Sequence, residues 1–216
     1  MRETSVSFGT CYIVGAAPQA NEIYPTREDF VVAADGGCAH LRRWGRTPDF
    51  VVGDLDSLEG APPSGVPCRR FPTKKDNTDT ALALQEGFAR GYRRFELVGC
   101  TAGRPDHTFA NQQLLLWAAR QGAFACLRGE GCRATALVGG GELRLRGQGT
   151  VSVFAFDGAA EGVTIKGMCY PLNNETLWGD TPRGISNQLD GEGYVALQSG
   201  ALLVFWEDTI EPLANI

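Results

Sequence analysis

The sequence has no run of ~18 or more apolar residues, so it predicts no transmembrane helix. Its first residues, Met1-Arg2-Glu3-Thr4, lack the long apolar stretch of a signal peptide. Basic residues do not predominate, and the net charge of −5 argues against a nucleic-acid-binding protein, which needs a basic surface. These absences lead us to expect a cytoplasmic protein that binds neither membranes nor nucleic acids.

The seven cysteines are scattered, and no pair has the CxxC spacing of common zinc sites. Several lie inside apolar segments, as Cys11 and Cys126 do. We therefore expect buried, reduced thiols and no zinc site. With 43% hydrophobic and 21% charged residues, the 216-residue chain has the composition of a globular protein with one large domain or two small ones.

The first ~125 residues alternate short apolar runs with helical patterns, which is typical of an α/β domain. The runs are near-continuously apolar, as expected for parallel strands covered on both faces. The predicted strands are Cys11–Val14, Phe30–Ala34, Phe50–Val52, Phe95–Val98 and Ala123–Leu127.

Two helices are predicted in this part of the chain. The first begins near Asp79, after an N-cap at Asn77 or Thr78, and its apolar residues recur with helical spacing. The second begins within residues 106–108 and ends with Gly122.

After residue ~125 glycine becomes frequent and short apolar runs follow one another without a helical period, which indicates antiparallel strands. These runs are Val151–Phe156, Val163–Lys166, Tyr194–Leu197 and Leu202–Trp206. We predict an α/β domain over residues 1–128, with a mainly parallel sheet, and an antiparallel β-sandwich domain over residues 132–216.

Three aspartates follow predicted strands. Asp35 comes after Phe30–Ala34, and Asp54 and Asp56 come after Phe50–Val52. The carboxyl ends of parallel strands meet at one edge of a sheet, and residues two apart in an extended segment point to the same side. Crowded carboxylates repel each other unless a cation such as Mg²⁺ neutralises them. The alternative, that Asp-Gly pairs only mark turns, explains Asp35 better than it explains Asp54 and Asp56 together.

The segment Lys75-Asp76-Asn77-Thr78-Asp79 places more charges at the start of the first predicted helix. Asp79 is a candidate third metal ligand, and Lys75 is a candidate partner of phosphate oxygens. The alternatives are an ordinary N-cap with an aspartate favoured by the helix dipole, and a lysine that stays solvated.

A loop of small residues, Gly99-Cys100-Thr101-Ala102-Gly103, joins a predicted strand to the second predicted helix. Small residues let backbone N–H groups approach a phosphate, and the helix N-terminus adds positive potential. Arg104 adds a forked donor for phosphate. The loop is neither a Walker A sequence nor GxGxxG, so the pattern alone is weak. His107 is either a ligand contact or, as is commoner at a helix start, a structural residue.

Five segments occur in the order typical of thiamine pyrophosphokinases, and together they make the chain resemble that family. They are Ala34-Asp35-Gly36-Gly37; Pro48-Asp49 with Gly53-Asp54-Leu55-Asp56-Ser57; Lys75-Asp76-Asn77-Thr78-Asp79; Gly103-Arg104-Pro105-Asp106-His107 with Ala110-Asn111; and Gly184-Ile185-Ser186-Asn187. The chain departs from the family in the loop Gly15-Ala16-Ala17-Pro18, where members often have an asparagine, and at Cys100 and Thr101, where glycine is frequent.

The resemblance implies a homodimer whose active site lies between the α/β domain of one subunit and the β domain of the other. It implies Mg²⁺ bound by Asp54, Asp56 and Asp79, which are also the implied catalytic residues. Candidate contacts to ATP and its phosphates are Asp35, Gly36, Lys75, Thr78, Arg104, Asp106 and His107. Thiamine contacts are implied for Ser186 and Asn187, with Tyr170 and Trp178 as candidate aromatic contacts.

The implied reaction is the Mg²⁺-dependent transfer of diphosphate from ATP to the hydroxyl of thiamine, which gives thiamine diphosphate and AMP. Catalysis of this kind rests mostly on positioning and charge neutralisation. A related Mg²⁺-dependent diphosphokinase or phosphohydrolase for another small substrate is the main alternative, because substrate choice depends on details of the pocket. A non-catalytic small-ligand-binding protein is a third reading, but it would not need the complete acidic cluster.

Overall fold

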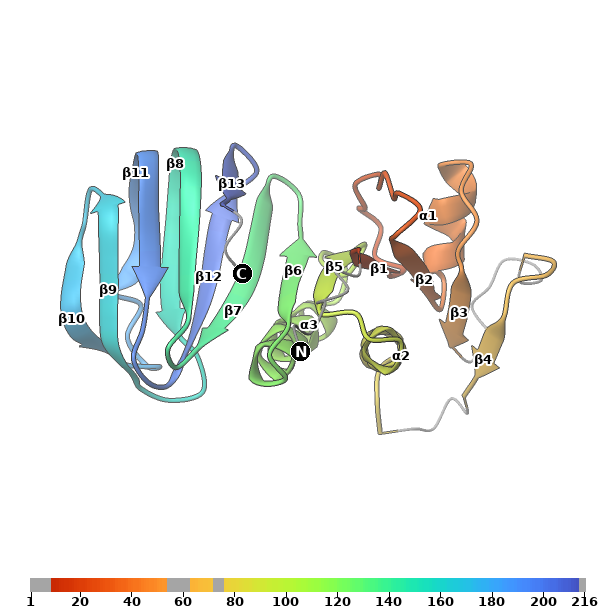
Figure 1. Ribbon diagram of the computed structural model, residues 1–216, viewed down its shortest axis with the longest axis horizontal. Helices are drawn as coiled ribbons and strands as arrows, with labels where there is room; N and C mark the ends of the chain where they lie inside the picture. The colour runs from red at the N-terminus through yellow and green to blue at the C-terminus, as the bar shows by residue number, and fades with distance from the viewer. Residues whose placement is uncertain (1–8, 54–62, 72–75, 214–216) are drawn as a thin grey trace, which may run out of the picture. The chain divides into compact units, whose positions relative to one another are not determined.

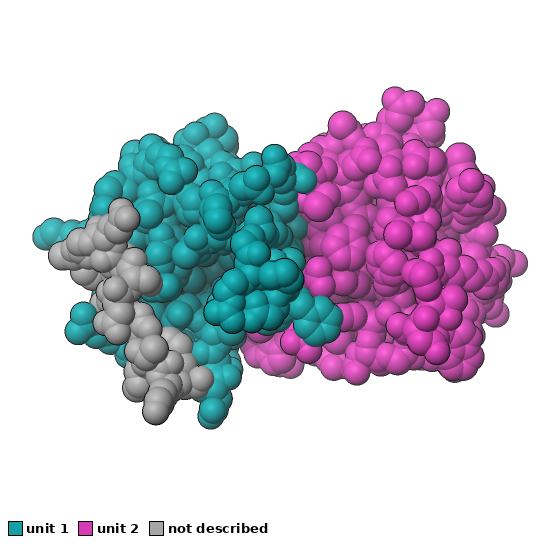
Figure 2. All heavy atoms as spheres, turned by 180° about the vertical axis from the view of Figure 1, so that it is seen from behind, with its two compact units in different colours: residues 1–111, 127–130 teal, residues 112–126, 131–216 magenta. Residues whose placement is uncertain are grey.

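The computed structural model describes residues 9–53, 63–71 and 76–213 of the chain. The chain divides into two compact units, coloured separately in Figure 2: residues 1–111 with 127–130, and residues 112–126 with 131–216. The division passes through a helix and a strand, so it differs from the limits expected from the sequence. The domain limits 1–128 and 132–216 therefore stay a prediction.

The first unit contains a parallel sheet whose strands lie in the order β5-β1-β2-β3-β4 (Figure 1). These strands are β1 (Cys11–Val14), β2 (Phe30–Ala34), β3 (Phe50–Gly53), β4 (Cys68–Arg70) and β5 (Arg94–Val98). Ile13 of β1 lies in register with Val32 of β2 and Leu97 of β5, and all three side chains are buried. Because the strands are parallel, the carboxyl ends of β1, β2, β3 and β5 lie at the same edge of the sheet.

The described residues form three helices, α1 (Gly37–Arg43), α2 (Asp79–Ala89) and α3 (Pro105–Arg120). α2 starts where the sequence predicted, because Thr78 is its N-cap and Thr78 Oγ1 accepts a hydrogen bond from the Ala81 N–H at 3.2 Å. α1 packs against β1 and β2. Its first residue, Gly37, is so close to the sheet that an added Cβ would lie 1.8 Å from the Val14 carbonyl oxygen.

The second unit contains antiparallel strands in the order β10-β9-β11-β8-β12-β7, with β13 also paired to β8 (Figure 1). They are β7 (Cys132–Val138), β8 (Glu142–Ala155), β9 (Ala160–Met168), β10 (Leu172–Leu177), β11 (Gly184–Ala196), β12 (Ala201–Glu207) and β13 (Ile210–Pro212); β6 (Phe124–Arg128) precedes β7 in the chain. The long strand β8 pairs with β13 around Gly147 and with β12 from Val151 onward.

Each unit has its own hydrophobic core. In the first unit the core packs β1, β2, β3 and β5 against α1 through Val14, Ile23, Val31, Ala33, Cys38, Leu41, Val51 and Val98. In the second unit the core includes the fully buried Trp206 of β12 together with Leu143 and Leu145 of β8. Burying a large apolar side chain contributes roughly 2–3 kcal/mol, so each core stabilises the strands that it joins.

The predicted fold class is confirmed, with parallel strands in the N-terminal part and antiparallel strands in the C-terminal part. The limits of β1 and β2 are those predicted, whereas the predicted strand Val151–Phe156 is only the last part of β8. α1, β4, β7, β10 and β13 were not predicted. None of the helices in the described residues has the length and apolar character needed to cross a membrane.

Candidate functional site

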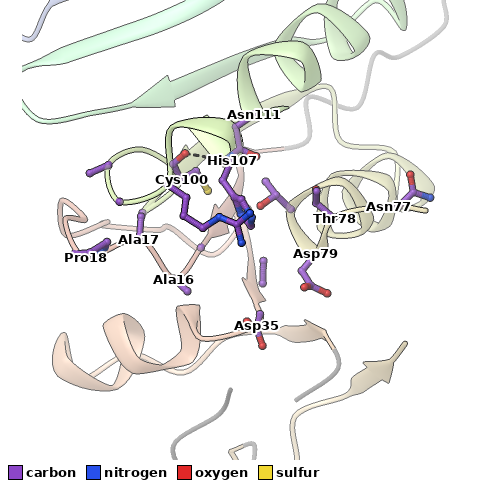
Figure 3. A pocket seen from close by; sticks show the side chains of 17 residues that line it. Ala16, Ala17, Pro18, Asp35, Asn77, Thr78, Asp79, Cys100, His107 and Asn111 are labelled. Carbon is purple, nitrogen blue, oxygen red and sulfur yellow. Dashed lines mark hydrogen bonds between the residues drawn. The ribbon is translucent and has the colours of Figure 1, made fainter. Parts of the chain in front are cut away.

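A cavity of about 500 Å³ lies at the carboxyl edge of the parallel sheet (Figure 3). It is bounded by the loops that follow β1 and β5, by the end of β2, and by the first turns of α2 and α3. Its lining consists of residues 15–18, 34–35, 77–80, 99–100, 102–104, 107 and 111. Ligands of open parallel sheets bind at this edge.

The loop after β1 (residues 15–18, the first loop) and the loop after β5 (residues 99–104, the second loop) are joined backbone to backbone. The Gly15 N–H donates to the Val98 carbonyl oxygen at 2.8 Å, and the Ala17 N–H donates to the Gly99 carbonyl oxygen at 2.9 Å. A Cβ on Gly15 would lie 2.6 Å from the Gly99 carbonyl oxygen. Only glycine at position 15 therefore permits this close approach.

The second loop has left-handed backbone at three residues. The φ angles are 62° at Gly99, 65° at Ala102 and 79° at Gly103. Turns with left-handed residues direct successive N–H groups into a concavity that suits anions. The approach of a phosphate to the backbone of this loop stays a prediction.

Two helix starts face the same cavity. The residues from Asn77 to Thr80 contribute the N-cap and first turn of α2, and Arg104 and His107 contribute the start of α3. Figure 3 shows Asp79 and His107 around one space, with Asp35 below them. The unpaired N–H groups and partial positive charge of a helix start favour phosphate oxygens.

Asp35 occupies an unusual backbone position at the end of β2. Its φ is 51°, in the left-handed region that non-glycine residues seldom adopt, and its N–H donates to the Val52 carbonyl oxygen at 2.7 Å. A Cβ on Gly53 would lie 3.1 Å from the Asp35 Cα. A strained backbone of this kind costs about 1 kcal/mol or more and is typical of functional sites.

Arg104 and Asp106 form a two-pronged ion pair at the start of α3. Arg104 Nε donates to Asp106 Oδ1 at 3.1 Å and a terminal nitrogen donates to Asp106 Oδ2 at 2.6 Å. These hydrogen bonds from Arg104 hold the pKa of the Asp106 carboxyl below its usual value. Both side chains are exposed, so a phosphate would compete with Asp106 for the guanidinium.

The predicted ATP contacts are distributed unevenly around the cavity. Four of them line it, Asp35, Thr78, Arg104 and His107, and so does Asp79, the candidate metal ligand. Gly36 and Asp106 are not among the lining residues. Three predicted site residues, Asp54, Asp56 and Lys75, lie outside the described residues. Within the part of the chain that the structure describes, no group of three or more His, Cys, Asp or Glu side chains is placed to hold a metal ion.

The first loop and Asn111 also line the cavity, although the sequence analysis did not assign them a ligand contact. The signal available for the first loop was its small residues, Gly15-Ala16-Ala17, directly after a predicted parallel strand. Asp49, which belongs to one of the family-like segments, has a structural role instead: its Oδ2 accepts from the Val31 N–H at 2.8 Å and its own N–H donates to the Val31 carbonyl oxygen at 2.8 Å.

A second cavity, of about 380 Å³, lies in the antiparallel unit. It is lined by Ile165, Cys169, Tyr170, Pro171, Leu172, Arg183, Gly184, Ile185 and Asn187. Two of the predicted thiamine contacts, Tyr170 and Asn187, are therefore in its wall, whereas Ser186 and Trp178 are not. Tyr170 is 68% exposed and Trp178 is 60% exposed, which is unusual for large aromatic side chains.

Asn187 and Ser186 differ in how accessible their side chains are to a ligand. The Asn187 side chain is buried and its amide is engaged with the backbone of Tyr170. Ser186 is exposed, has a left-handed φ of 58°, and donates its backbone N–H to Ser152 Oγ at 3.0 Å. Asn187 thus positions the wall of the second cavity, while the Ser186 side chain is accessible.

Two family models match the chain, and they define its class as a diphosphotransferase with a catalytic part and a vitamin-binding part. Residues 22–127 match "Thiamin pyrophosphokinase, catalytic domain", and residues 142–202 match "Thiamin pyrophosphokinase, vitamin B1 binding domain". Together these matches cover more than half of the chain. The chain therefore belongs to the thiamine pyrophosphokinase family, as its sequence motifs indicated.

Solved structures share the fold over nearly the whole chain. The thiamine pyrophosphokinase of Bacillus subtilis is 24% identical, with a TM-score of 0.83, over 92% of this chain and 99% of that one. The Geobacillus thermodenitrificans structure is 24% identical, with a TM-score of 0.79, over 93% and 98%. The yeast enzyme is 13% identical, with a TM-score of 0.70, over 94% and 87%. At these identities the likeness establishes the fold. No curated protein sequence matches the chain significantly.

Proposed function

We propose that this chain transfers the diphosphate of ATP to the hydroxyl of thiamine, giving thiamine diphosphate and AMP. The observation that carries the proposal is the cavity of about 500 Å³ in which two helix starts and two strand-end loops converge. Such a site suits a polyphosphate, because backbone N–H groups and helix dipoles stabilise negative charge without a matching cationic side chain. The two family matches supply the identity of the acceptor alcohol.

The phosphates of ATP are proposed to lie against the starts of α2 and α3, with Thr78, Arg104 and His107 within reach. Asp54, Asp56 and Asp79 are proposed to hold Mg²⁺. Asp79 and Asp35 both line the cavity and offer the hard oxygen donors that Mg²⁺ prefers, so the described donors fit the ion. When bound, Mg²⁺ would neutralise charge on the phosphate oxygens.

The chain's own residues mainly bind and orient the reactants. The hydroxyl oxygen of thiamine forms a bond to the β-phosphorus, the bond from that phosphorus to the oxygen bridging to the α-phosphate breaks, and AMP leaves with that oxygen. The hydroxyl proton is released. Holding the hydroxyl in line with the breaking bond, in a site with fixed N–H donors, accounts for much of the rate increase of such transfers.

The thiamine site is proposed to include Ser186, Asn187, Tyr170 and Trp178. Tyr170 and Trp178 offer exposed aromatic faces on which flat, partly cationic rings can stack. Asn187 contributes by fixing the backbone at Tyr170, and Ser186 contributes an accessible hydroxyl.

The proposal is tested by incubating purified protein with ATP, Mg²⁺ and thiamine and identifying both products by chromatography. We expect AMP and thiamine diphosphate in equal amounts. ADP with thiamine monophosphate would refute diphosphate transfer. If thiamine does not stimulate ATP turnover but another alcohol or phosphate ester is converted, the chain has a related activity instead.

A cytoplasmic homodimer with a shared active site is part of the same proposal. The exposed Tyr170, Trp178 and Ile185 support it, because apolar side chains of this size on one unit are typical of surfaces covered in an assembly.

Subunit complementation tests the shared site. Asp79→Asn and Trp178→Ala chains, each inactive alone, are mixed and allowed to exchange. If the two residues act in one site across the interface, random pairing restores about a quarter of wild-type activity. Chains that run as monomers by light scattering, or mixtures that stay inactive despite proven exchange, would contradict the shared site.

A further inference from the structure

Buried polar side chains are rare in the described residues, and two of them contact the loops of the cavity in the first unit. His40 on α1 and Asn111 on α3 are each only 5% exposed. Burying a polar group costs free energy unless the group is hydrogen-bonded. The hydrogen-bond partner of such a group therefore indicates which part of the protein it holds in place. In both residues the partner is a backbone carbonyl oxygen of a cavity loop.

His40 holds the first loop. Its Nε2 lies 2.8 Å from the Ala17 carbonyl oxygen, and because a carbonyl oxygen only accepts, Nε2 must carry the hydrogen. The ring stacks on Trp44 with centroids 5.6 Å apart, which fixes its orientation. His40 Nδ1 is buried and has no hydrogen-bond partner among the described residues. The histidine thus makes one directed hydrogen bond, and that bond goes to the cavity wall.

Asn111 holds the second loop. Its Nδ2 donates to the Cys100 carbonyl oxygen at 2.7 Å from within α3, a contact drawn as a dashed line in Figure 3. Cys100 follows Gly99, the residue whose carbonyl oxygen accepts from the Ala17 N–H. Both backbone polar groups of Ala17 are therefore fixed, the carbonyl by His40 and the N–H by Gly99.

These hydrogen bonds connect α1 to α3 through the two loops. They run from His40 to Ala17, from Ala17 to Gly99, and from Cys100, the next residue, to Asn111. The first loop in this sequence has no polar side chain of its own, since it reads Gly15-Ala16-Ala17-Pro18. It can contact a nucleotide only through backbone atoms and small apolar groups. Its contribution to nucleotide binding therefore depends on the position of its backbone.

We propose that His40 and Asn111 are positioning residues of the nucleotide cavity, which hold the first and second loops in the geometry that binds ATP. The proposal rests on the proposed function for the identity of the ligand. It does not require thiamine turnover, because ATP binding reports the geometry of the loops directly.

The key test compares two substitutions of His40. His40→Gln places an amide nitrogen near the position of Nε2, whereas His40→Asn is too short to reach Ala17. Titration with a non-hydrolysable ATP analogue and Mg²⁺ is expected to give about a tenfold higher Kd for His40→Asn and less than about a threefold change for His40→Gln. In the steady state, KM for ATP should follow Kd, and KM for thiamine should not.

A matched control separates positioning from general loss of stability. Thr135 in the second unit is 1% exposed and donates from Oγ1 to the Ala125 carbonyl oxygen at 2.7 Å. Thr135→Val removes the same kind of buried bond away from the cavity. It should lower the Tm by an amount similar to His40→Asn and leave the Kd for the ATP analogue unchanged.

Asn111→Leu tests the hydrogen bond to the second loop, and Asn111→Ser is used if the leucine variant does not fold. Each should raise the Kd about tenfold. Because the two contacts act on one hydrogen-bonded segment, combining His40→Asn with an Asn111 variant should raise the Kd by clearly less than the product of the single effects.

Three results would overturn the proposal: equal Kd values for His40→Gln and His40→Asn, a Kd change in Thr135→Val as large as in His40→Asn, or fully multiplicative single effects. If wild-type protein binds the ATP analogue but does not convert thiamine, the proposed function fails while the positioning test remains decisive. If it does not bind the analogue at all, both fail.

Discussion

Asn187 and Tyr170 are joined by two hydrogen bonds: Asn187 Oδ1 accepts from the Tyr170 N–H at 2.8 Å, and Asn187 Nδ2 donates to the Tyr170 carbonyl oxygen at 2.8 Å. Asn187 Oδ1 also accepts from the Gln188 N–H at 3.0 Å. The amide of Asn187 is therefore used within the protein. Asn187 lines the second cavity, and its amide also fixes the backbone of Tyr170 in the wall of that cavity.

Replacing Asn187 with leucine should therefore weaken thiamine binding indirectly. Loss of the amide frees the backbone at Tyr170, and we expect KM for thiamine to rise about tenfold with little change in KM for ATP. The control is Gln188→Leu, because Gln188 is exposed and its amide donates to Thr150 Oγ1 instead. Equal effects of the two substitutions on KM for thiamine would show that Asn187 does not act through Tyr170.

Cys169 offers a direct probe of the second cavity, whose wall it shares. The other exposed thiols are Cys68 and Cys132, whereas burial raises the pKa of Cys100 to about 12 and keeps it in the unreactive thiol form at neutral pH. In the Cys68→Ser, Cys132→Ser variant, thiamine at ten times its Kd should slow iodoacetamide labelling about tenfold.

The protection experiment has an internal comparison, because ATP with Mg²⁺ should not protect Cys169 when thiamine is absent. Mass spectrometry of peptides checks which thiol is labelled. A labelling rate that stays constant up to saturating thiamine would place the thiamine site elsewhere.

Gly37 should be among the least replaceable residues of the first unit. In Gly37→Ala the new Cβ would lie 1.8 Å from the Val14 carbonyl oxygen, and neither α1 nor β1 can move without disturbing the core. We expect the free energy of unfolding to fall by about 3 kcal/mol in urea titrations. In Gly36→Ala the nearest atom is the Ala16 Cβ at 3.0 Å, so the loss should be below about 1 kcal/mol. Similar losses in both variants would contradict this account of the α1 contact.

The sequence predicted the elements whose signals are local and strong. β1 and β2 are unbroken apolar runs that are mostly buried, and α2 has a capping threonine before its periodic apolar residues. α1 was missed because its start, Gly36-Gly37, is typical of a turn. β4 was missed because all three of its residues, Cys68–Arg70, are exposed, and such a strand is formed by pairing with β3 and not by burial.

The candidate site was also predictable only in part, because some of its contacts join residues that are distant in the sequence and leave no local pattern. Parallel topology brings the ends of strands together, and Asp35, Arg104 and His107 line one cavity at that edge, while their contacts with ATP stay a prediction. The contact of His40 with Ala17 joins residues 23 apart through a backbone atom, and no pattern of residue types marks it. Asp106 pairs with Arg104, two residues away, and its contact with ATP stays a prediction.

Asp79 and Asp76 are two aspartates of one segment, and the structure separates them. Asp79 is the first residue of α2 and lines the cavity, whereas Asp76 is exposed and is not part of the lining. If Asp79 helps to hold Mg²⁺ on the phosphates, Asp79→Asn should reduce kcat at least about a hundredfold and shift the Mg²⁺ dependence to higher concentrations. Its free energy of unfolding should change by less than about 1 kcal/mol, because a carboxylate in the first turn of a helix contributes about that much through the helix dipole.

Asp76→Asn removes the same charge a few residues earlier and should keep both kcat and the Mg²⁺ dependence of the wild type. Measuring initial rates across a range of free Mg²⁺ separates the two effects, because a weakened metal site regains activity at high Mg²⁺ whereas a misfolded site does not. If Asp79→Asn and Asp76→Asn lose activity equally, only the general negative potential of the segment matters, and Asp79 has no specific role at the metal.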